Sequence, residues 1–534
     1  MRRALVAVVF VLILVAGAAR GSLFRGTEGN DKLIGSAGAD TIYGLGGQDV
    51  IEGRGGPDLI NAGFGRDVIK GGAGDDMIAA QDGAVDHIAC GPGADIVTAD
   101  LGDRVAADCE TVSRRLGRDT TTDPRAQHST QVEPDSFSWG KTVVAAFQNG
   151  RISNGGAAAI GWATTKDAGK TWRSGIIPLG TYGLVSDPVV AYDAKHATWM
   201  VAGLGAGFRD LAIWVSRSKD GLTWGQPIVA AGDADEDYDK EWIACDNGVK
   251  SRFRGSCYLA YVDINTHWLA MRYTRDGGLT WSKPVKIQPG VPDATFTGPM
   301  PVVQPDGTVV VPYSLYAPID NGEDRISAVI SEDGGVTYSA PFRIARLISE
   351  ELMPVRAPSM PSADVDAAGR MYVVWQDSRE RLGATENDIV FATSTNGRTW
   401  AAPQRIPMPS AGDVNYWLPA IAVEPGSSGK TAKLAVAYYS LKLRAGCALF
   451  VPGCSQEVHA WTARSADGGD TWTKPRRLNA EPMRLEWIAD SSLGRMLGDY
   501  ISVSWAGGKA IPVLALAGEP TLALEQAVFA ASAP

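Results

Sequence analysis

Between residues 26 and 79, apolar and polar positions repeat with a period of nine residues. Each unit has the form Gly-x-x-Gly-x-Asp-x-(Leu/Ile)-x, so glycine, aspartate and one aliphatic residue keep fixed places. The aliphatic places are Leu33, Ile42, Ile51, Ile60, Ile69 and Ile78. One apolar residue per unit, flanked by glycines that allow tight turns, predicts a thin coil of short strands.

The aspartates of these units are expected to stack one above another along the coil. They are Asp31, Asp40, Asp49, Asp58, Asp67 and Asp76. Stacked carboxylates repel one another, and Ca²⁺, which takes about six to eight oxygen ligands from carboxylates and carbonyls, removes that repulsion. We therefore expect these aspartates to bind calcium and the segment to need it for folding. A glycine-rich linker is the alternative, but a linker has no reason to keep three residue types in register.

This stretch resembles the RTX, or haemolysin-type, calcium-binding repeats. The resemblance implies a parallel β-roll with calcium between its turns. It also implies two rows of aspartates on opposite sides: Asp31, Asp49 and Asp67 in one, and Asp40, Asp58 and Asp76 in the other. Degenerate units follow, and the segment between Cys90 and Cys109 is expected to close the roll as a disulfide-bonded cap. We expect this domain to span residues 20–112, followed by a linker at 113–125.

In residues 126–534 longer strand-like segments alternate with six copies of a (Ser/Thr)-x-Asp-(x)-Gly-x-Thr-aromatic turn. The aspartate, once replaced by asparagine, is expected to accept hydrogen bonds from backbone N–H groups two residues on, while glycine allows the reversal. The aromatic residue packs against neighbouring strands. The six positions are Asp167, Asp220, Asp276, Asp333, Asn396 and Asp467. We interpret them as turn-stabilising residues and not as catalytic carboxylates.

These turns resemble the Asp-boxes of the sialidase, or BNR-repeat, superfamily, and the resemblance implies an all-β propeller over residues 126–534. Inner-strand candidates begin near Glu133, Asp187, Asp239, Gly298, Ala357, Trp417 and Gly498. We expect seven blades, with six as the alternative. Residues 127–132 are expected to supply the fourth strand of the last blade and so close the ring.

A sialidase of that superfamily needs three arginines that grip the substrate carboxylate, a tyrosine nucleophile with its glutamate, and an aspartate acid/base. Glu133-Pro134-Asp135 stands where the first arginine would be, and residues 147–165, where the acid would lie, contain no carboxylate. The remaining catalytic candidates are Tyr500, Glu241, Asp239, Arg356 and Arg379, and Asp377 is a further member of this rearranged set. Near strand ends, Arg151, Arg356 and Arg379 are candidates to hold an anionic sugar by bidentate hydrogen bonds. A buried tyrosine with a satisfied hydroxyl and solvated rim arginines are the alternatives.

The run from Asp233 to Glu241 places several carboxylates directly before an inner strand. Three interpretations stay open: a solvated acidic loop, a second calcium site, or acid/base chemistry on a glycosidic bond.

The N-terminus has the order of a secretory signal peptide, expected at residues 1–19: Arg2-Arg3, an apolar run to Val15, then small residues. The apolar run is too short to span a bilayer, and no longer run follows. An exported chain favours disulfides, here between the sequence-local pairs Cys90 and Cys109, Cys245 and Cys257, and Cys447 and Cys454.

The net charge of −10 disfavours nucleic-acid binding, because phosphate neutralisation needs clustered Lys and Arg. We therefore expect a secreted, extracellular protein that binds calcium, with a propeller that engages a glycan or a cell-surface protein. The alternative is an exo-α-sialidase-type glycoside hydrolase with a rearranged catalytic set.

Overall fold

The computed structural model describes residues 21–180, 182–207, 211–233, 235–288, 290–291, 293–318, 322–381, 386–409, 412, 414–442, 456–521 and 523–533. The expected signal peptide and the pair Cys447 and Cys454 lie outside the described residues. The described chain is all-β, with 3-10 turns at Gly429–Thr431 and Leu485–Trp487 as its helical segments. None of the helices in this described part is long and apolar enough to cross a membrane.

The chain forms two compact units. Unit 1 comprises residues up to Asp95 together with Gly102–Cys109, and unit 2 comprises Ile96–Leu101 together with the residues from Glu110 onward.

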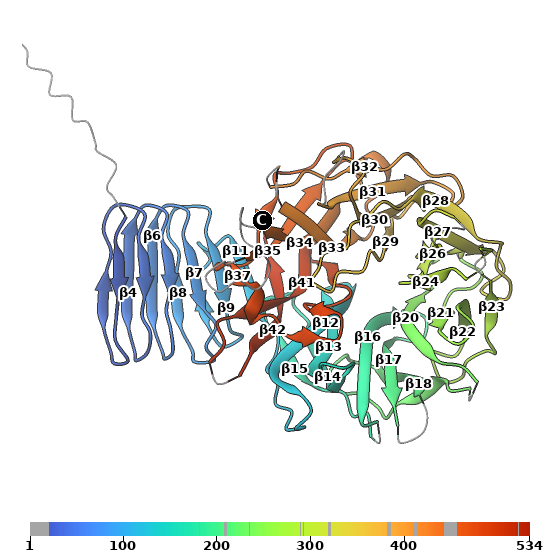
Figure 1. The fold of residues 1–534 in the computed structure, drawn as a ribbon, viewed down its shortest axis with the longest axis horizontal. Helices are drawn as coiled ribbons and strands as arrows, with labels where there is room; N and C mark the ends of the chain where they lie inside the picture. Colours follow the sequence, from blue (N-terminus) through green and yellow to red (C-terminus); the bar gives the residue numbers. More distant parts are fainter. Residues whose placement is uncertain are drawn as a thin grey trace, which may run out of the picture. The chain divides into compact units, whose positions relative to one another are not determined.

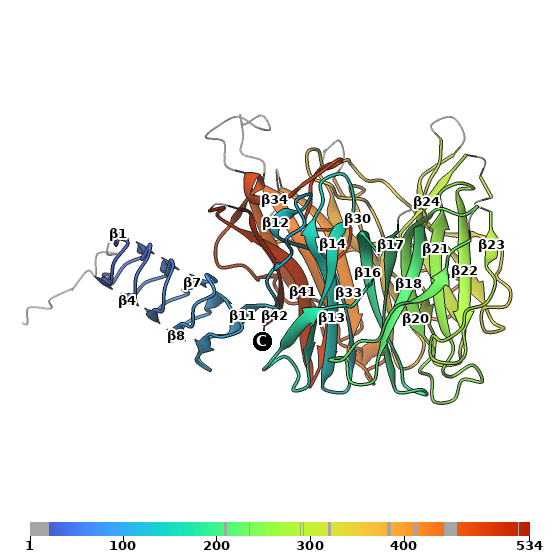
Figure 2. The ribbon, with the colours of Figure 1, turned by 90° about the horizontal axis from the view of Figure 1, so that it is seen from below.

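Unit 1 is a parallel β-roll whose short strands alternate between two sheets, so that one coil takes two nonapeptide units (Figures 1 and 2). One sheet holds β1 (Leu23–Arg25), β3 (Thr41–Tyr43), β5 (Leu59–Asn61) and β7 (Met77–Ala80). The other holds β2 (Lys32–Ile34), β4 (Val50–Gly55), β6 (Val68–Ala73), β8 (His87–Ala89) and β10 (Arg104–Val105). The repeat isoleucines stack in register across the strands, and those of the inner coils are buried. The thin core is therefore the one that the nine-residue pattern predicts.

Unit 2 is built of consecutive antiparallel sheets that follow one another around a common centre (Figure 1). The first sheet holds β12 (Gln127–Trp139), β13 (Thr142–Arg151), β14 (Ala157–Thr165) and β15 (Arg173–Ile176). The second holds β16 (Leu184–Asp193), β17 (Thr198–Ala206), β18 (Leu211–Ser218) and β19 (Ile228–Ala231). The third holds β20 (Tyr238–Cys245), β21 (Cys257–Asp263), β22 (Trp268–Thr274) and β23 (Val285–Ile287).

The next three sheets are also antiparallel. The fourth holds β24 (Thr295–Thr297), β25 (Val302–Val303), β26 (Val309–Tyr316), β27 (Arg325–Ser331) and β28 (Phe342–Arg346). The fifth holds β29 (Ser362–Val365), β30 (Met371–Asp377), β31 (Asp388–Ser394) and β32 (Gln404–Arg405). The sixth holds β33 (Val414–Val423), β34 (Leu434–Lys442), β35 (Glu457–Ser465), β36 (Arg476–Arg477) and β37 (Met483–Arg484).

The last sheet corrects one expectation about how the ring is closed. It holds β40 (Ser502–Ala506), β41 (Lys509–Gly518) and β42 (Glu525–Ser532), and β42 pairs with β11 (Thr111–Arg115), which in turn pairs with β9 (Ile96–Ala99). Residues 127–132 belong instead to β12, whose strand pairing with this sheet is a single bridge, Thr130 to Gln526. The strand was missed because β11 reads TVSRR, a polar sequence whose alternate residues are nevertheless buried.

The Asp-box turns have the predicted role. In the first box, for example, Asp167 accepts hydrogen bonds from the Thr171 N–H (2.9 Å) and the Thr171 hydroxyl (2.7 Å). The acceptor reaches residues further along than expected. In boxes with one extra residue between the aspartate and the glycine of the motif, the bonded N–H groups lie three or four positions on. The shorter boxes at Asp220 and Asn396 bond two and three positions on.

Two predicted disulfides are present, Cys90–Cys109 in unit 1 and Cys245–Cys257 between β20 and β21.

Candidate functional site

The carboxylates of unit 1 form two ladders. In each ladder, the backbone N–H of an aspartate donates to Oδ1 of the aspartate one coil further along the chain, at 2.7 to 2.9 Å. One ladder runs through Asp31, Asp49, Asp67 and Asp86, and the other through Asp40, Asp58, Asp76 and Asp95. The six predicted aspartates therefore lie in two rows, as the repeat resemblance implies, and Asp86 and Asp95 extend them.

The second carboxylate oxygens of the inner ladder residues are buried and have no hydrogen-bond partner in the described structure. They are Oδ2 of Asp49, Asp58, Asp67, Asp76 and Asp86. Burial, reinforced by the neighbouring carboxylates, raises the pKa of Asp58 and Asp67 to about 6 and that of Asp76 and Asp86 to about 7. Burying a negatively charged oxygen without a partner costs free energy, and a cation bound beside these atoms would offset that cost.

The first glycine of each unit leaves room beside these oxygens. A Cβ at Gly44, Gly53 or Gly71 would clash with Oδ2 of the aspartate five residues on. Among the described residues no group of three or more His, Cys, Asp or Glu side chains lies close enough to hold a metal by itself. The donors on offer are thus single carboxylate oxygens and turn carbonyls, an all-oxygen set that fits Ca²⁺ better than zinc or a softer metal.

In unit 2, bulges near the beginning of the inner strands bring charged residues together. The register of β12, β16 and β20 shifts at Glu133, Asp187 and Lys240, and these residues have φ of +51°, +50° and +52°. Left-handed backbone is uncommon for residues other than glycine. The bulges turn three charged side chains away from the ordinary alternation of their strands.

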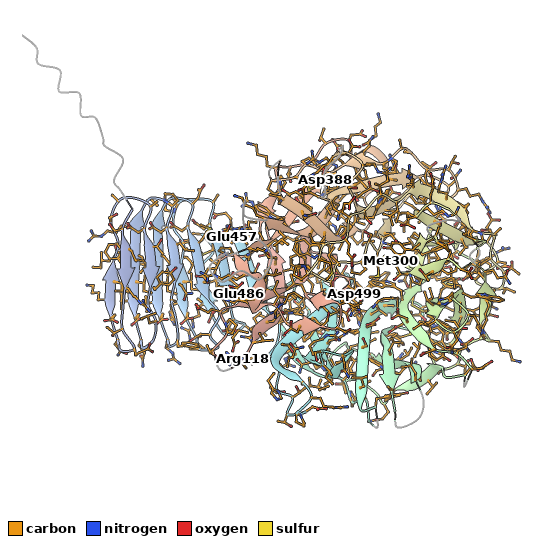
Figure 3. All side chains as sticks on the ribbon, viewed as in Figure 1. Arg118, Met300, Asp388, Glu457, Glu486 and Asp499 are labelled. Atoms are coloured by element: carbon orange, nitrogen blue, oxygen red, sulfur yellow. A yellow bond between two sulfur atoms is a disulfide. The ribbon has the colours of Figure 1, made fainter. Side chains whose placement is uncertain are left out.

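The bulge residues meet Asp499 and Arg356 in one buried cluster, the bulge cluster. Lys240 Nζ lies 2.6 Å from Asp499 Oδ2 and 3.0 Å from Asp187 Oδ2. Arg356 donates to both oxygens of Asp499, from Nε at 2.6 Å and from an NH2 group at 2.5 Å. Although burial opposes it, the charges of Lys240 and Arg356 hold the pKa of Asp499 well below its usual range. Figure 3 labels Asp499 near the centre of the sheets.

Glu133 completes the cluster in a different charge state. Its carboxylate accepts from Gln148 Nε2 and, at 3.2 Å, from the Asp499 N–H. Burial, together with the charges of Asp187 and Asp499, raises the pKa of Glu133 to about 8. Glu133 is therefore mainly protonated at neutral pH.

A small hairpin positions Arg356. The hairpin is formed by β38 (Asp490–Ser491) and β39 (Gly494–Arg495), and the Arg495 carbonyl accepts from the Arg356 N–H at 2.9 Å. Arg495 N–H donates in turn to the Pro354 carbonyl at 2.7 Å, and Ser492 N–H donates to the Ser153 carbonyl at 2.9 Å.

Four of the five predicted catalytic residues lie in or next to this cluster. Arg356 belongs to it, and Asp239 lies 3.8 Å from Lys240 with its side chain 42% exposed. Tyr500 donates its hydroxyl to the Pro188 carbonyl at 3.0 Å, and burial raises its pKa well above the ordinary value. Glu241 is buried with neither carboxylate oxygen partnered within the described structure, and burial raises its pKa well above the ordinary value.

The structure does not bring Arg379 to this cluster. Arg379 forms a two-point pair with Asp377, at 2.8 and 2.7 Å, beside the ring of Trp375. Arg151 is buried nearer the cluster, where it donates to the Gly156 carbonyl at 2.8 Å and to Gln148 at 3.3 Å. Each of these arginines is thus already engaged by protein groups.

The acidic run before β20 is also engaged. Glu236, only 8% exposed, lies 2.7 Å from Lys286 and accepts from the Tyr261 hydroxyl at 3.0 Å. Arg272 pairs with both Glu236 and Asp233. At Glu236 the expectation of a solvated loop is therefore wrong, because cations from β22 and β23 neutralise this part of the run.

Sequence reasoning missed Lys240, Asp187 and Asp499 as members of one site. A signal was present: Lys240 is the one cation inside the run from Asp233 to Glu241, and Asp187 precedes a proline at the head of an inner strand, as Glu133 does. What the sequence does not give is the pairing, which joins Glu133 to Asp499 across 366 residues.

Comparison with known proteins supports both parts of the chain. Residues 196–426 match the family model described as the BNR repeat-like domain, and segments 25–60 and 52–84 match that of the RTX calcium-binding nonapeptide repeat. No curated protein matches the chain.

Several solved structures are similar over much of the chain, although at low identity and with TM-scores below 0.5. A protein of unknown function from Dyadobacter fermentans has 16% identity and a TM-score of 0.43, covering 67% of this chain and 98% of that one. A Penicillium chrysogenum α-L-arabinanase complexed with arabinobiose has 15% identity and a TM-score of 0.41, covering 62% and 93%. A Hadza microbial sialidase has 16% identity and a TM-score of 0.40, covering 61% and 66%.

The two family matches agree with the two resemblances predicted from the motifs, since the chain matches an RTX calcium-binding nonapeptide repeat in its first part and a BNR repeat-like domain in its second.

Proposed function

We propose that this is a secreted calcium-binding protein whose propeller engages an extracellular glycan or protein. The observation that carries the calcium part is the row of buried ladder oxygens without partners, which a divalent cation would neutralise. Disulfides and RTX-type repeats, both typical of exported proteins, support the extracellular location.

The calcium ligands are inferred to be the carboxylates of the two ladders together with carbonyls of the glycine turns. The carboxylates are those of Asp31, Asp40, Asp49, Asp58, Asp67 and Asp76. Each ion bound between successive coils would relieve the repulsion and desolvation that raise the pKa of the inner aspartates. When bound, calcium supplies fixed positive charge, and the chain's own part is to hold the oxygens in line.

The test is thermal melting and calorimetric titration of the full secreted chain, first stripped with EDTA. Because calcium binds only the folded roll, its addition should raise the melting temperature of that unit and release measurable binding heat. Mg²⁺ at the same concentration should do much less, since it prefers six tightly held ligands and retains water. A chain whose melting curve and binding heat ignore Ca²⁺ would contradict the proposal.

For unit 2 we infer a propeller of seven blades, the last being formed by β40, β41, β42 and β11. We place the ligand face at the bulged ends of the inner strands, where Asp239 is exposed next to the bulge cluster. Screening the calcium-loaded protein on a glycan array, with Asp239→Asn as the variant, tests the glycan part. Binding to no glycan, with retention on cell surfaces that protease treatment abolishes, would favour a protein ligand.

A glycoside hydrolase is the second candidate, and one specific observation favours it. Glu241 keeps a raised pKa and unpartnered oxygens beside Tyr500, and protonated carboxyls of this kind serve as general acids. Turnover of fluorogenic sialosides and neutral glycosides would reveal activity. Tyr500→Phe and Glu241→Gln should each remove that activity, whereas Arg379→Lys, away from the cluster, should retain it.

A further inference from the structure

Unit 2 contains a cavity of about 640 Å³ that is lined by none of the bulge-cluster residues. It follows the inner strands from Asp135, Trp242, Met300 and Ile501 to the turns at their far ends, such as Gly140 and Gly426. Figure 3 labels Met300 near the middle of the sheets. A cavity of this size accommodates a small organic molecule.

The bulge cluster lies outside this cavity, because none of its five residues lines the cavity wall. Trp242 packs edge-to-face on Tyr500 at 5.1 Å, and this pair and Asp499 line a separate, much smaller space of about 20 Å³.

The charge of the cavity wall has a single sign. Its titratable side chains, among the described residues, are Asp135, Asp364, Asp366 and Glu424, with no Lys, Arg or His. Two of these acids are already used, because Asp366 accepts from turn N–H groups and Glu424 pairs with Lys433 at 2.8 Å. The other two, Asp135 and Asp364, face no cation within salt-bridge distance in the described part of the chain.

Backbone bonds from the neighbouring sheet fix these two carboxylates. The Val190 N–H donates to Asp135 at 2.7 Å, and the Val423 N–H donates to Asp364 at 2.7 Å. Burial raises the pKa of Asp135 to about 7 and that of Asp364 to about 6, as expected for carboxyls held in place without a compensating cation.

The rest of the wall is aromatic and aliphatic. Trp139, Trp242 and Trp505 line it, together with valines and isoleucines of the inner strands. Indole faces attract ammonium groups, and methylene chains pack on aliphatic walls. A bare metal ion fits poorly, because no group of three or more metal-binding side chains lies together in the described residues.

We propose that this cavity binds a small organic cation with more than one ammonium group on an aliphatic backbone, held by Asp135 and Asp364 and packed against the tryptophans. The site is distinct from the glycan face and from the calcium ladders. The cavity along the inner strands would thus have its own ligand.

The experiment is isothermal titration of the full chain with spermidine, in saturating Ca²⁺ so that the roll's carboxylates are occupied. We expect saturable one-to-one binding to the wild type, and no binding of 1,8-octanediol, which has a similar length but no charge. Asp135→Asn keeps an acceptor for the Val190 N–H but removes the charge. It should raise the dissociation constant of spermidine at least tenfold, as expected for the loss of one charge-assisted hydrogen bond. Asp364→Asn provides a second, independent variant.

The control variant is Glu519→Gln, which removes an exposed carboxylate that does not line the cavity. It should bind spermidine as the wild type does. Equal affinity in Asp135→Asn, Asp364→Asn and Glu519→Gln would show attraction to the acidic surface alone and would overturn the proposal. Binding of the diol as tight as that of spermidine would also overturn the proposal, because it would show an apolar site. Full displacement of spermidine by millimolar Mg²⁺ would overturn it as well, because it would show a metal site.

Discussion

Replacing Asp76 with asparagine should stabilise the roll in the absence of calcium and reduce the stability that calcium adds. Asp76 is fully buried, with Oδ1 bonded to the Asp58 N–H at 2.9 Å and Oδ2 unpartnered in the described structure. Asparagine keeps the bonded oxygen and the shape of the side chain, while an uncharged NH2 group replaces the unpartnered oxygen. The substitution therefore isolates the electrostatic contribution of one ladder position.

The magnitude follows from the pKa. Burial and neighbouring carboxylates raise the pKa of Asp76 from 3.8 to about 7, and that difference corresponds to about 4 kcal/mol against ionisation in the folded state. Above pH 7 in EDTA, Asp76→Asn should avoid much of this cost and stabilise the roll by roughly 1 to 4 kcal/mol. In saturating Ca²⁺ the same variant lacks a charged ligand, so its calcium-dependent gain in stability should be smaller than that of the wild type.

The assay is calorimetric melting of the full chain in EDTA and in Ca²⁺, with Asp75→Asn as the matched control. Asp75 is the neighbouring carboxylate, but it is exposed and lies outside the ladders. Asparagine keeps the oxygen that accepts from the Ala94 N–H, so this substitution should change both curves much less than Asp76→Asn does. The reasoning is refuted by a lower melting temperature for Asp76→Asn in EDTA, or by a calcium response equal to that of the wild type.

Three further predictions concern pH, the bulge cluster and an Asp-box. Without calcium, the roll should lose stability as pH rises from about 4 to 8 in denaturant titrations, since ladder carboxyls with a folded pKa near 6 to 7 favour folding only while protonated. Asp499→Asn should destabilise unit 2 by about 3 to 5 kcal/mol in urea unfolding, because Lys240 and Arg356 lose their charged partner. Glu133→Gln replaces a protonated carboxyl and should cost less than about 1 kcal/mol in the same assay. Asp333→Ala should cost about 1 to 2 kcal/mol in the same assay by removing the bonds to Thr337, and an unchanged unfolding midpoint would contradict the turn role.

The roll was predictable because its contacts are local and periodic. Each coil contacts the next through residues 17 to 19 positions apart, so the nine-residue pattern already contains the stacking of Ile42 on Ile60 and of Asp40 on Asp58. The Asp-box turns were predictable for the same reason, since each one bonds within five residues. Only the count of residues between acceptor and donor needed the structure.

The contacts that the sequence did not predict are long-range. β11 pairs with β42 across about 420 positions, and its sequence carries no apolar run that would mark a strand. The sequence does not join Lys240, Asp187 and Asp499, because the bulges that turn them together depend on the packing of several sheets. Charge alone, without register, does not tell a solvated residue from a buried pair.

The position of the bulge cluster suggests why a propeller would bury so many charges. A buried ion pair adds little net stability, because desolvation offsets most of the attraction, but removing one partner is costly. Arg356 reaches Asp499 across 143 residues, and Asp499 meets Glu133, near the start of the ring, across 366. An arrangement with the last sheet displaced would leave Lys240 and Arg356 buried without Asp499. The penalty then falls on the wrongly closed ring, so the cluster favours correct closure more than it raises overall stability. Asp499→Asn should therefore slow the refolding of unit 2, while the folded structure changes little.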